Sequence, residues 1–225
     1  MTPRTRRRTE ALSRDRIVEA AVELLDAGGE AGLTFRTLTE RLETGAGAIY
    51  WHVANKDELL AAATDGVVAA ALAVGSPGSP PDEIRAVALG LFEAIEQHPW
   101  LATQLALQFS RSPSGSVTPR IFEAIGRRVR SLGVPAGHRF TTTSALVSYI
   151  LGAAGQNAAN AQSAAHANRA EFLDAVSDAW EELDAREYPF MREIAAEQRG
   201  HDDREQFLAG VDLVLAGITA VHRAG

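Results

Sequence analysis

Residues 34–60 read TFRTLTERLETGAGAIYWHVANKDELL, and this segment carries the most specific structural pattern in the chain. Thr34 is a favourable residue for a helix N-cap, because its hydroxyl can accept a hydrogen bond from a free backbone N–H. Phe35, Leu38 and Leu42 follow it at helical spacing, whereas a strand would alternate apolar and polar residues. The pattern therefore predicts a short helix that begins directly after Thr34.

The helical pattern breaks at Thr44 and Gly45 and resumes over 46–53, where Ile49 and Val53 are the inward-facing apolar residues. Two short helices joined by a tight turn form a helix-turn-helix, whose second helix enters the major groove of DNA with its N-terminal residues. Glycines at the start of this helix keep its surface slender, so its backbone can approach another molecule closely.

A resemblance to a known family rests on the same stretch. Asn55 is predicted to cap the next helix, with Glu58 in the capping-box position. The segment AGAIYWHVANKDELL (46–60) resembles the DNA-binding domain of the TetR/AcrR-type regulators, and LTFRTLTERL (33–42) is similar to the second helix of that domain. The resemblance covers about residues 13–65 well and the remainder only as a general helical pattern. It implies an all-α protein with an N-terminal three-helix helix-turn-helix domain and a larger C-terminal helical domain for ligand binding and dimerisation.

Three residues depart from the family's pattern. Glu43 stands where glycine is usual, Thr44 where a small apolar residue is usual, and Thr39 where alanine is usual in the second helix. The turn is therefore expected to be shifted or strained. Either Thr44 or Gly45 caps the second helix of the motif, and the alignment with the family favours Gly45. The acidic side chain of Glu43 would oppose DNA binding unless it points away from the phosphates.

The resemblance and the side-chain chemistry assign residues to DNA contact. Arg36 is expected to read a base edge, most simply O6 and N7 of guanine, with a solvated helix start as the alternative. Lys56 lies at a positive helix N-terminus and is the expected phosphate contact. Tyr50 and His52 are expected at phosphate or sugar, and Trp51 mostly in the core. The full set is Arg36, Thr37, Thr44, Gly45, Ala46, Gly47, Ala48, Tyr50, Trp51, His52 and Lys56, with Arg6, Arg7 and Arg8 of a basic N-terminal arm.

Composition limits the alternatives. The chain has 225 residues, 46% of them hydrophobic, which suits one large or two modest helical domains. The net charge of −7 is the wrong sign for a protein that coats nucleic acid, but four arginines lie in the first eight positions. This arm either contacts phosphates or a minor groove, or is a solvated terminus. The absence of cysteine and of any apolar run of ~18 residues predicts a cytoplasmic protein without a membrane span.

The domain boundary is predicted inside the helix that begins at Lys56. Residues 1–60 would form the arm and the helix-turn-helix domain, and 61–225 the ligand-binding and dimerisation domain. The first helix is capped by Ser13 and is expected to end at Gly28-Gly29. Apolar periodicity and loop signals predict the remaining helices; these cover 56–74, 82–97, 100–109, 118–132, 138–165, 168–186, 190–198 and 203–222.

The C-terminal helices suggest a dimer and a sensor. The helix over 138–165 has a face of small residues, and 203–222 has a strongly apolar stripe, so both are predicted at a homodimer interface; the alternative is packing within the chain. The small residues are Ser144, Ser148, Gly152, Gly155 and Ala159. The resemblance implies release from a palindromic operator by a small, partly apolar effector. Candidate effector contacts, which could instead be ordinary core or surface, are Trp100, Phe109, Phe122, Tyr149, Gln156, Asn157 and Trp180.

Two other classes of protein are weaker interpretations. An all-α di-iron enzyme needs paired Glu-x-x-His motifs, and no such motif, HExxH motif, phosphate-binding glycine loop or nucleophile elbow occurs. His52 has no second ligand at metal-binding spacing, and His201-Asp202 is better explained as a helix cap. No catalytic residue, metal or cofactor is therefore predicted. A structural protein that binds DNA without sequence preference is opposed by the acidic balance.

Overall fold

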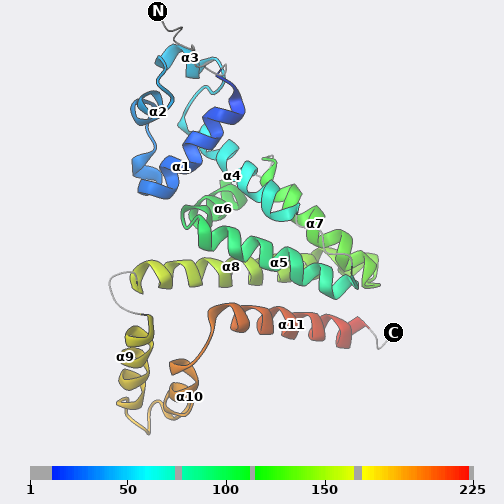
Figure 1. Cartoon of the computed structure of the whole chain (residues 1–225). Coiled ribbons are helices and arrows are strands. Elements are labelled where there is room, and N and C mark those ends of the chain that lie inside the picture. The colour runs from blue at the N-terminus through cyan, green and yellow to red at the C-terminus, as the bar shows by residue number, and fades with distance from the viewer. Residues whose placement is uncertain (1–11, 74–77, 112–114, 165–168, 223–225) are drawn as a thin grey trace, which may run out of the picture. The chain divides into compact units, whose positions relative to one another are not determined.

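The computed structural model describes residues 12–73, 78–111, 115–164 and 169–222, and these ranges contain helices and no strand, which confirms the all-α prediction (Figure 1). The chain divides into two compact units, Met1–Gly66 and Val67–Gly225. The division falls inside α4 (Lys56–Leu72), the same helix in which the sequence suggests a boundary near residue 60.

The N-terminal unit contains three helices and the first part of a fourth: α1 (Arg14–Gly32), α2 (Phe35–Leu42), α3 (Ala46–Tyr50) and the beginning of α4. Ser13 caps α1, and its hydroxyl accepts the N–H of Arg16 at 3.2 Å. Gly29 has φ 60° and ψ −162°, so the regular helix is interrupted at its predicted end, and a further short helical segment then continues to Gly32.

A small apolar core holds this unit together. α1 packs on α2, and α2 packs on α3. Each helix buries the residues that its apolar periodicity places inward, because removal of apolar surface from water is the main stabilising contribution for so small a unit. The fully buried apolar side chains are Ile17, Ala21, Leu25, Leu33, Leu38, Ile49, Val53, Leu59 and Ala63.

The C-terminal unit is built around α8, which packs against α5, α6, α7 and α11. Most bounds lie within two residues of the prediction. The described elements are α5 (Pro80–Gln97), α6 (Trp100–Arg111), α7 (Val117–Ser131), η1 (Ala136–His138), α8 (Arg139–Ala164), α9 (Arg169–Glu181), α10 (Pro189–Arg199) and α11 (Asp203–His222).

The helix predicted over 168–186 is shorter than expected, since α9 ends at Glu181. Asp184 explains this end, because its carboxylate accepts the backbone N–H of Arg186 at 2.7 Å and of Glu187 at 3.1 Å and forms a local turn. The guanidinium of Arg192 binds the carbonyl of Glu181, which is left without a helical partner there. The α9 helix then packs closely on α10.

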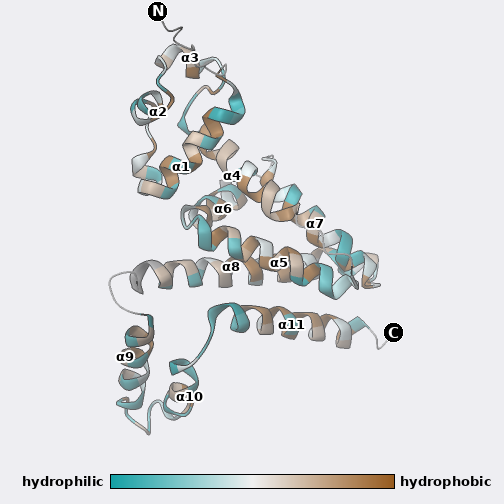
Figure 2. Cartoon of the chain, viewed as in Figure 1, coloured by the Kyte–Doolittle hydropathy of each residue, from teal (hydrophilic) through white to brown (hydrophobic). Residues whose placement is uncertain are grey.

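α11 is anchored to α5 and α8 by a few specific contacts. The Phe92 and Phe207 rings lie 4.7 Å apart, and Arg85 Nε donates to the Asp212 carboxylate at 2.6 Å. This hydrogen bond raises the pKa of Arg85. Tyr149 donates its hydroxyl to the carbonyl of Phe207 at 3.1 Å. Figure 2 shows that α11 is largely apolar beyond its first turn, whereas α9 and α10 are mainly hydrophilic.

Candidate nucleic-acid interface

The start of α2 is fixed by a capping box. The hydroxyl of Thr34 accepts the N–H of Thr37 at 3.1 Å, and the N–H of Thr34 donates to the hydroxyl of Thr37 at 3.0 Å. Thr37 also donates to the carbonyl of Gly32 at 2.9 Å. The structure therefore places the Thr37 side chain in the cap, half-buried, with its hydroxyl occupied by contacts inside the protein.

The turn between α2 and α3 keeps its normal register. Glu43 has φ 50° and ψ 45°, the left-handed conformation that glycine favours at this position. Its N–H points to the carbonyl of Glu40 at 3.4 Å, and the N–H of Thr44 donates to the carbonyl of Thr39 at 3.1 Å. These two bonds are those of a Schellman motif. Glutamate at position 43, where the family usually has glycine, therefore strains the turn by about 1–2 kcal/mol but does not shift it.

Gly45, and not Thr44, is the N-cap of α3, with φ −84° and ψ 149°. The helix ends at Tyr50, earlier than the predicted residue 53, because the Ile49 carbonyl accepts the N–H groups of both His52 and Val53, at 2.9 and 3.1 Å. Ile49 and Val53 are 0% and 1% exposed, so their inward orientation is confirmed.

The other side of α3 is open to solvent. Gly45, Ala46, Gly47 and Ala48 are all exposed, and a Cβ added at Gly47 would meet no atom within 4 Å. Tyr50 is 52% exposed and Trp51 is 90% exposed. We call these six residues the α3 surface.

The expectation that Trp51 lies mostly in the core is wrong. Trp51 follows the end of α3, and the inner side is already filled by Ile49 and Val53, so the indole is left outside. A tryptophan with 90% of its surface in water is unusual for a monomeric surface and is typical of a binding site.

Neighbouring side chains hold the α3 surface in place. The ring of Tyr50 stacks on that of Phe35 at 4.5 Å with an interplanar angle of 17°, which links α3 to α2. After the turn, Asn55 Oδ1 accepts the N–H of Glu58 at 2.8 Å, and this confirms the predicted cap. The Glu58 carboxylate reaches back to the N–H of Ala54 rather than that of Asn55, at 2.8 Å. His52 is half-buried.

Lys56 is half-buried, and its Nζ donates to the backbone carbonyl of Glu30 at 2.7 Å. This bond holds the ammonium group at the end of α1 and uses one of its three N–H donors, so the others can meet a phosphate.

We expect Lys56→Ala to weaken binding to all DNA sequences about equally and to lower the slope of log affinity against log salt by ~1, because one phosphate contact is lost. Bandshift titrations at several salt concentrations, on operator and random duplexes, measure both quantities. Arg130→Ala removes the same charge from the exposed surface of α7 and serves as the control. A Lys56→Ala effect confined to one sequence would contradict the phosphate role.

Arg36 lies on the exposed first turn of α2, and its Nε is 3.0 Å from Glu40 Oε1. Both side chains are largely in water, at 87% and 62% exposure, and such pairs contribute little to stability. Arg36 can therefore exchange Glu40 for a base edge at little cost. Arg6, Arg7 and Arg8, also predicted to contact DNA, lie outside the described residues.

We expect Arg36→Ala to reduce discrimination against a single substituted base pair by roughly 1–3 kcal/mol, because one bidentate base contact is lost. Competition bandshifts with singly substituted operators give this value. Glu40→Ala, which removes the ion pair but keeps the arginine, should retain the preference. If Arg36→Ala binds every duplex as the wild type does, Arg36 has no role in reading bases.

The predicted effector contacts are dispersed over the C-terminal unit. Trp100 is buried at the start of α6, and Phe109 and Phe122 are half-exposed with rings 6.2 Å apart. Tyr149 is bonded to α11, and burial raises its pKa. Gln156 is exposed and donates to Asn160 at 3.0 Å. Trp180 is half-buried on α9.

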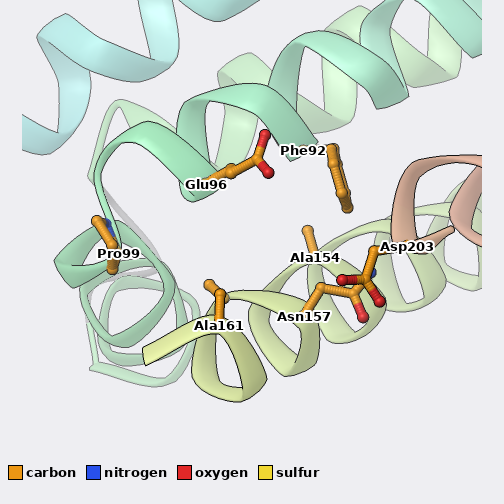
Figure 3. Close-up of a pocket in the computed structure, with 8 residues that line it drawn as sticks. Phe92, Glu96, Pro99, Ala154, Asn157, Ala161 and Asp203 are labelled. Atoms are coloured by element: carbon orange, nitrogen blue, oxygen red, sulfur yellow. The ribbon is translucent and has the colours of Figure 1, made fainter. Parts of the chain in front are cut away.

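Of these residues only Asn157 lines the pocket of about 240 Å³ in this unit (Figure 3). The other seven lining residues were not predicted from the sequence. The sequence did contain one indication of a pocket, because alanines at helical spacing on α8 leave room beside that helix. The missed residues are Phe92, Glu96, Pro99, Ala154, Ala158, Ala161 and Asp203.

Within the described ranges, no cluster of three His, Asp or Glu side chains is arranged to hold a metal ion. None of the described helices combines the length and apolar character that crossing a bilayer requires.

The fold and the α3 surface define a helix-turn-helix DNA-binding protein with a second, larger helical unit. Residues 17–63 match the bacterial regulatory proteins of the tetR family, and residues 77–222 match the tetracyclin repressor-like C-terminal domain. The chain belongs to the TetR family of transcriptional regulators, and the suspected resemblance is confirmed. The family is one of DNA-binding transcriptional regulators and not of enzymes.

One relative is an HTH-type transcriptional regulator of Saccharopolyspora erythraea, 34% identical over 152 residues. These residues make up 67% of this chain and 63% of the relative, so the match spans less than two thirds of the relative's length.

Solved structures agree over nearly the whole chain. The transcriptional regulator SCO7222, a TetR from Streptomyces coelicolor, is 66% identical with a TM-score of 0.88 over 94% of this chain and all of that one. Streptomyces coelicolor ActR in complex with actinorhodin is 26% identical, with a TM-score of 0.74 over 93% and 98% of the two chains. BioQ with its double-stranded DNA operator is 25% identical, with a TM-score of 0.62 over 93% and 99%.

Proposed function

We propose that this protein is a repressor that binds a palindromic operator as a homodimer and leaves it when a small, partly apolar effector binds the C-terminal unit. The observation that carries the proposal is the α3 surface, where four small residues and the exposed rings of Tyr50 and Trp51 lie on one solvent-facing side. Such a surface allows the helix backbone to approach base edges, and the methyl groups of Ala46 and Ala48 can meet a thymine methyl.

The proposed roles divide by chemistry. Arg36 reads a base, and the α3 surface fills the groove. Lys56, His52 and the basic arm contact the phosphates, because these contacts set position and affinity rather than sequence. Glu43 is exposed in the turn, and its carboxylate must point away from the phosphates for this arrangement to bind.

An exposed face of small residues on α8 and exposed apolar residues on α11 support the proposed homodimer. Ser148, Gly152 and Ala159 of α8 face solvent, and on α11 Leu213 is 75% exposed and Val221 is 70% exposed. A second copy covering both faces would bury this surface, and the resulting dimer would carry two α3 helices. A palindrome then requires half-sites about one helical turn, or ~34–36 Å, apart, or a multiple of that distance.

The proposed response to an effector uses α4, which begins in the N-terminal unit and continues into the C-terminal unit. An effector that prefers a conformation with a different α4 orientation changes the separation of the two α3 helices. The effector thereby lowers the affinity for the operator. The size of this decrease is limited by the difference between the effector's affinities for the DNA-binding conformation and for the other conformation. ActR with actinorhodin and BioQ with its operator give precedents for ligand and DNA binding in proteins of similar fold.

Selection of bound fragments from random DNA, followed by bandshift assays on the recovered sequence, tests the proposal. A palindromic sequence with two half-sites, bound by two chains, is the expected result. Binding without sequence preference, together with a steep salt dependence, would instead support a structural DNA-coating protein. A reporter gene placed behind the recovered operator then distinguishes repression from activation.

A further inference from the structure

A pocket of about 240 Å³ lies in the C-terminal unit, where α5, the start of α6, α8 and the start of α11 meet (Figure 3). Apolar groups make most of its wall. Phe92 comes from α5, Pro99 precedes α6, and three alanines lie on one side of α8: Ala154, Ala158 and Ala161. Pockets for drug-sized ligands are usually about 300–1,000 Å³, so this pocket fits roughly one ring with a short side chain.

Three polar residues also line the pocket, and they differ in the charge that they can offer a ligand. Asp203 is neutralised within the protein, because Arg169 Nη2 lies 2.6 Å from both of its carboxylate oxygens and His201 Nε2 lies 3.0 Å from one of them. Glu96 is exposed on α5 at the pocket, and among the described residues no cation pairs with it. Asn157 adds a neutral amide from α8.

We infer that this pocket takes a small organic cation with an apolar body, and that the Glu96 carboxylate selects its positive charge. The apolar wall would cover the body of the ligand and exclude water, which strengthens the attraction between its ammonium group and Glu96. An organic anion of the same size would meet the unpaired carboxylate instead. The inference that the effector binds in this pocket rests on the function proposed above. The inference that the pocket binds a cation rests only on the geometry of the pocket.

Three probes with one phenyl ring and different head groups test this inference on the full-length protein. These are 2-phenylethylamine, 2-phenylethanol and 3-phenylpropanoate, titrated by ligand-observed NMR at neutral pH. The amine is expected to bind about tenfold more tightly than the alcohol or the acid, because only the amine forms a charge-assisted hydrogen bond with Glu96.

Two variants locate the effect. Glu96→Gln should lower the affinity for the amine about tenfold and leave the alcohol unchanged. Glu93→Gln is the matched control, because Glu93 lies on the same helix, does not line the pocket, and faces Arg204 at 3.6 Å. Ala161 is exposed, and a leucine at this position would fill part of the pocket, so Ala161→Leu should lower the affinity for all three probes. The melting temperature of each variant shows whether it is folded.

An acid that binds as tightly as the amine, or a Glu96→Gln variant that binds the amine as the wild type does, would overturn the inference. So would the failure of every probe to bind. Operator binding by the ligand-free wild type is measured in parallel. If the wild type does not bind an operator, the proposed function is contradicted, but the measured probe affinities still test the cation site. If the wild type binds its operator and no probe binds the protein, only the cation site is overturned.

Discussion

Gly47→Glu is expected to lower operator affinity by more than about 100-fold, or roughly 3 kcal/mol, without destabilising the protein. Gly47 is the second residue of α3 and lies on its solvent side, and an added Cβ meets no atom within 4 Å. Because glutamate also favours a helix more than glycine does, by roughly 0.6 kcal/mol, the free protein should fold as before. At the DNA, however, the carboxylate would face phosphates and base acceptors, and like charges at an interface cost several kcal/mol.

The control for this variant is Gly28→Glu. Gly28 is also exposed, lies in the same unit, and has no atom within 4 Å of an added Cβ, so the variant has the same charge and similar surroundings. Anisotropy titrations of a labelled operator at fixed salt compare the two variants with the wild type. A large loss for Gly47→Glu and a small one for Gly28→Glu is the expected outcome. Equal losses would show a general charge effect and would argue against α3 as the DNA-reading helix.

Ile49→Ala is expected to lower the free energy of unfolding of the N-terminal unit by about 2–5 kcal/mol, the usual range for removing a large buried aliphatic side chain. Ile49 is 0% exposed and is the buried residue of α3, so its side chain attaches this five-residue helix to the core. A helix of this length has little stability of its own and depends on such packing. Because small domains are only marginally stable, a loss of this size should open the unit and abolish DNA binding.

Hydrogen exchange measures the Ile49→Ala effect locally. Amides of α2, α3 and the first turn of α4 should exchange faster, while those of α5 and α8 keep their protection. Ile49→Val leaves most of the side chain and should cost only about 0.5–1.5 kcal/mol. Unchanged exchange in α2 and α3 of Ile49→Ala would mean that α3 is held by other contacts, such as the stacked rings of Phe35 and Tyr50.

The amino-acid sequence was sufficient to predict the all-α fold, the positions of most helices and the inward direction of Ile49. It also determined the caps at Thr34 and Asn55. These features are local, because helical periodicity spans a few turns and a cap joins residues three apart. The motif around Tyr50 is likewise contiguous, and it was sufficient to indicate the family.

The tertiary structure decided the features that depend on distant segments. Trp51 is exposed because Ile49 and Val53 already fill the inner side, and no local pattern gives the space that remains there. The pocket joins Phe92 to Asp203, more than a hundred positions apart, and Asp203 is neutralised by Arg169 from another helix. Whether a side chain is buried, paired or open to a ligand depends on what packs against it, and a sequence pattern records only its neighbours along the chain.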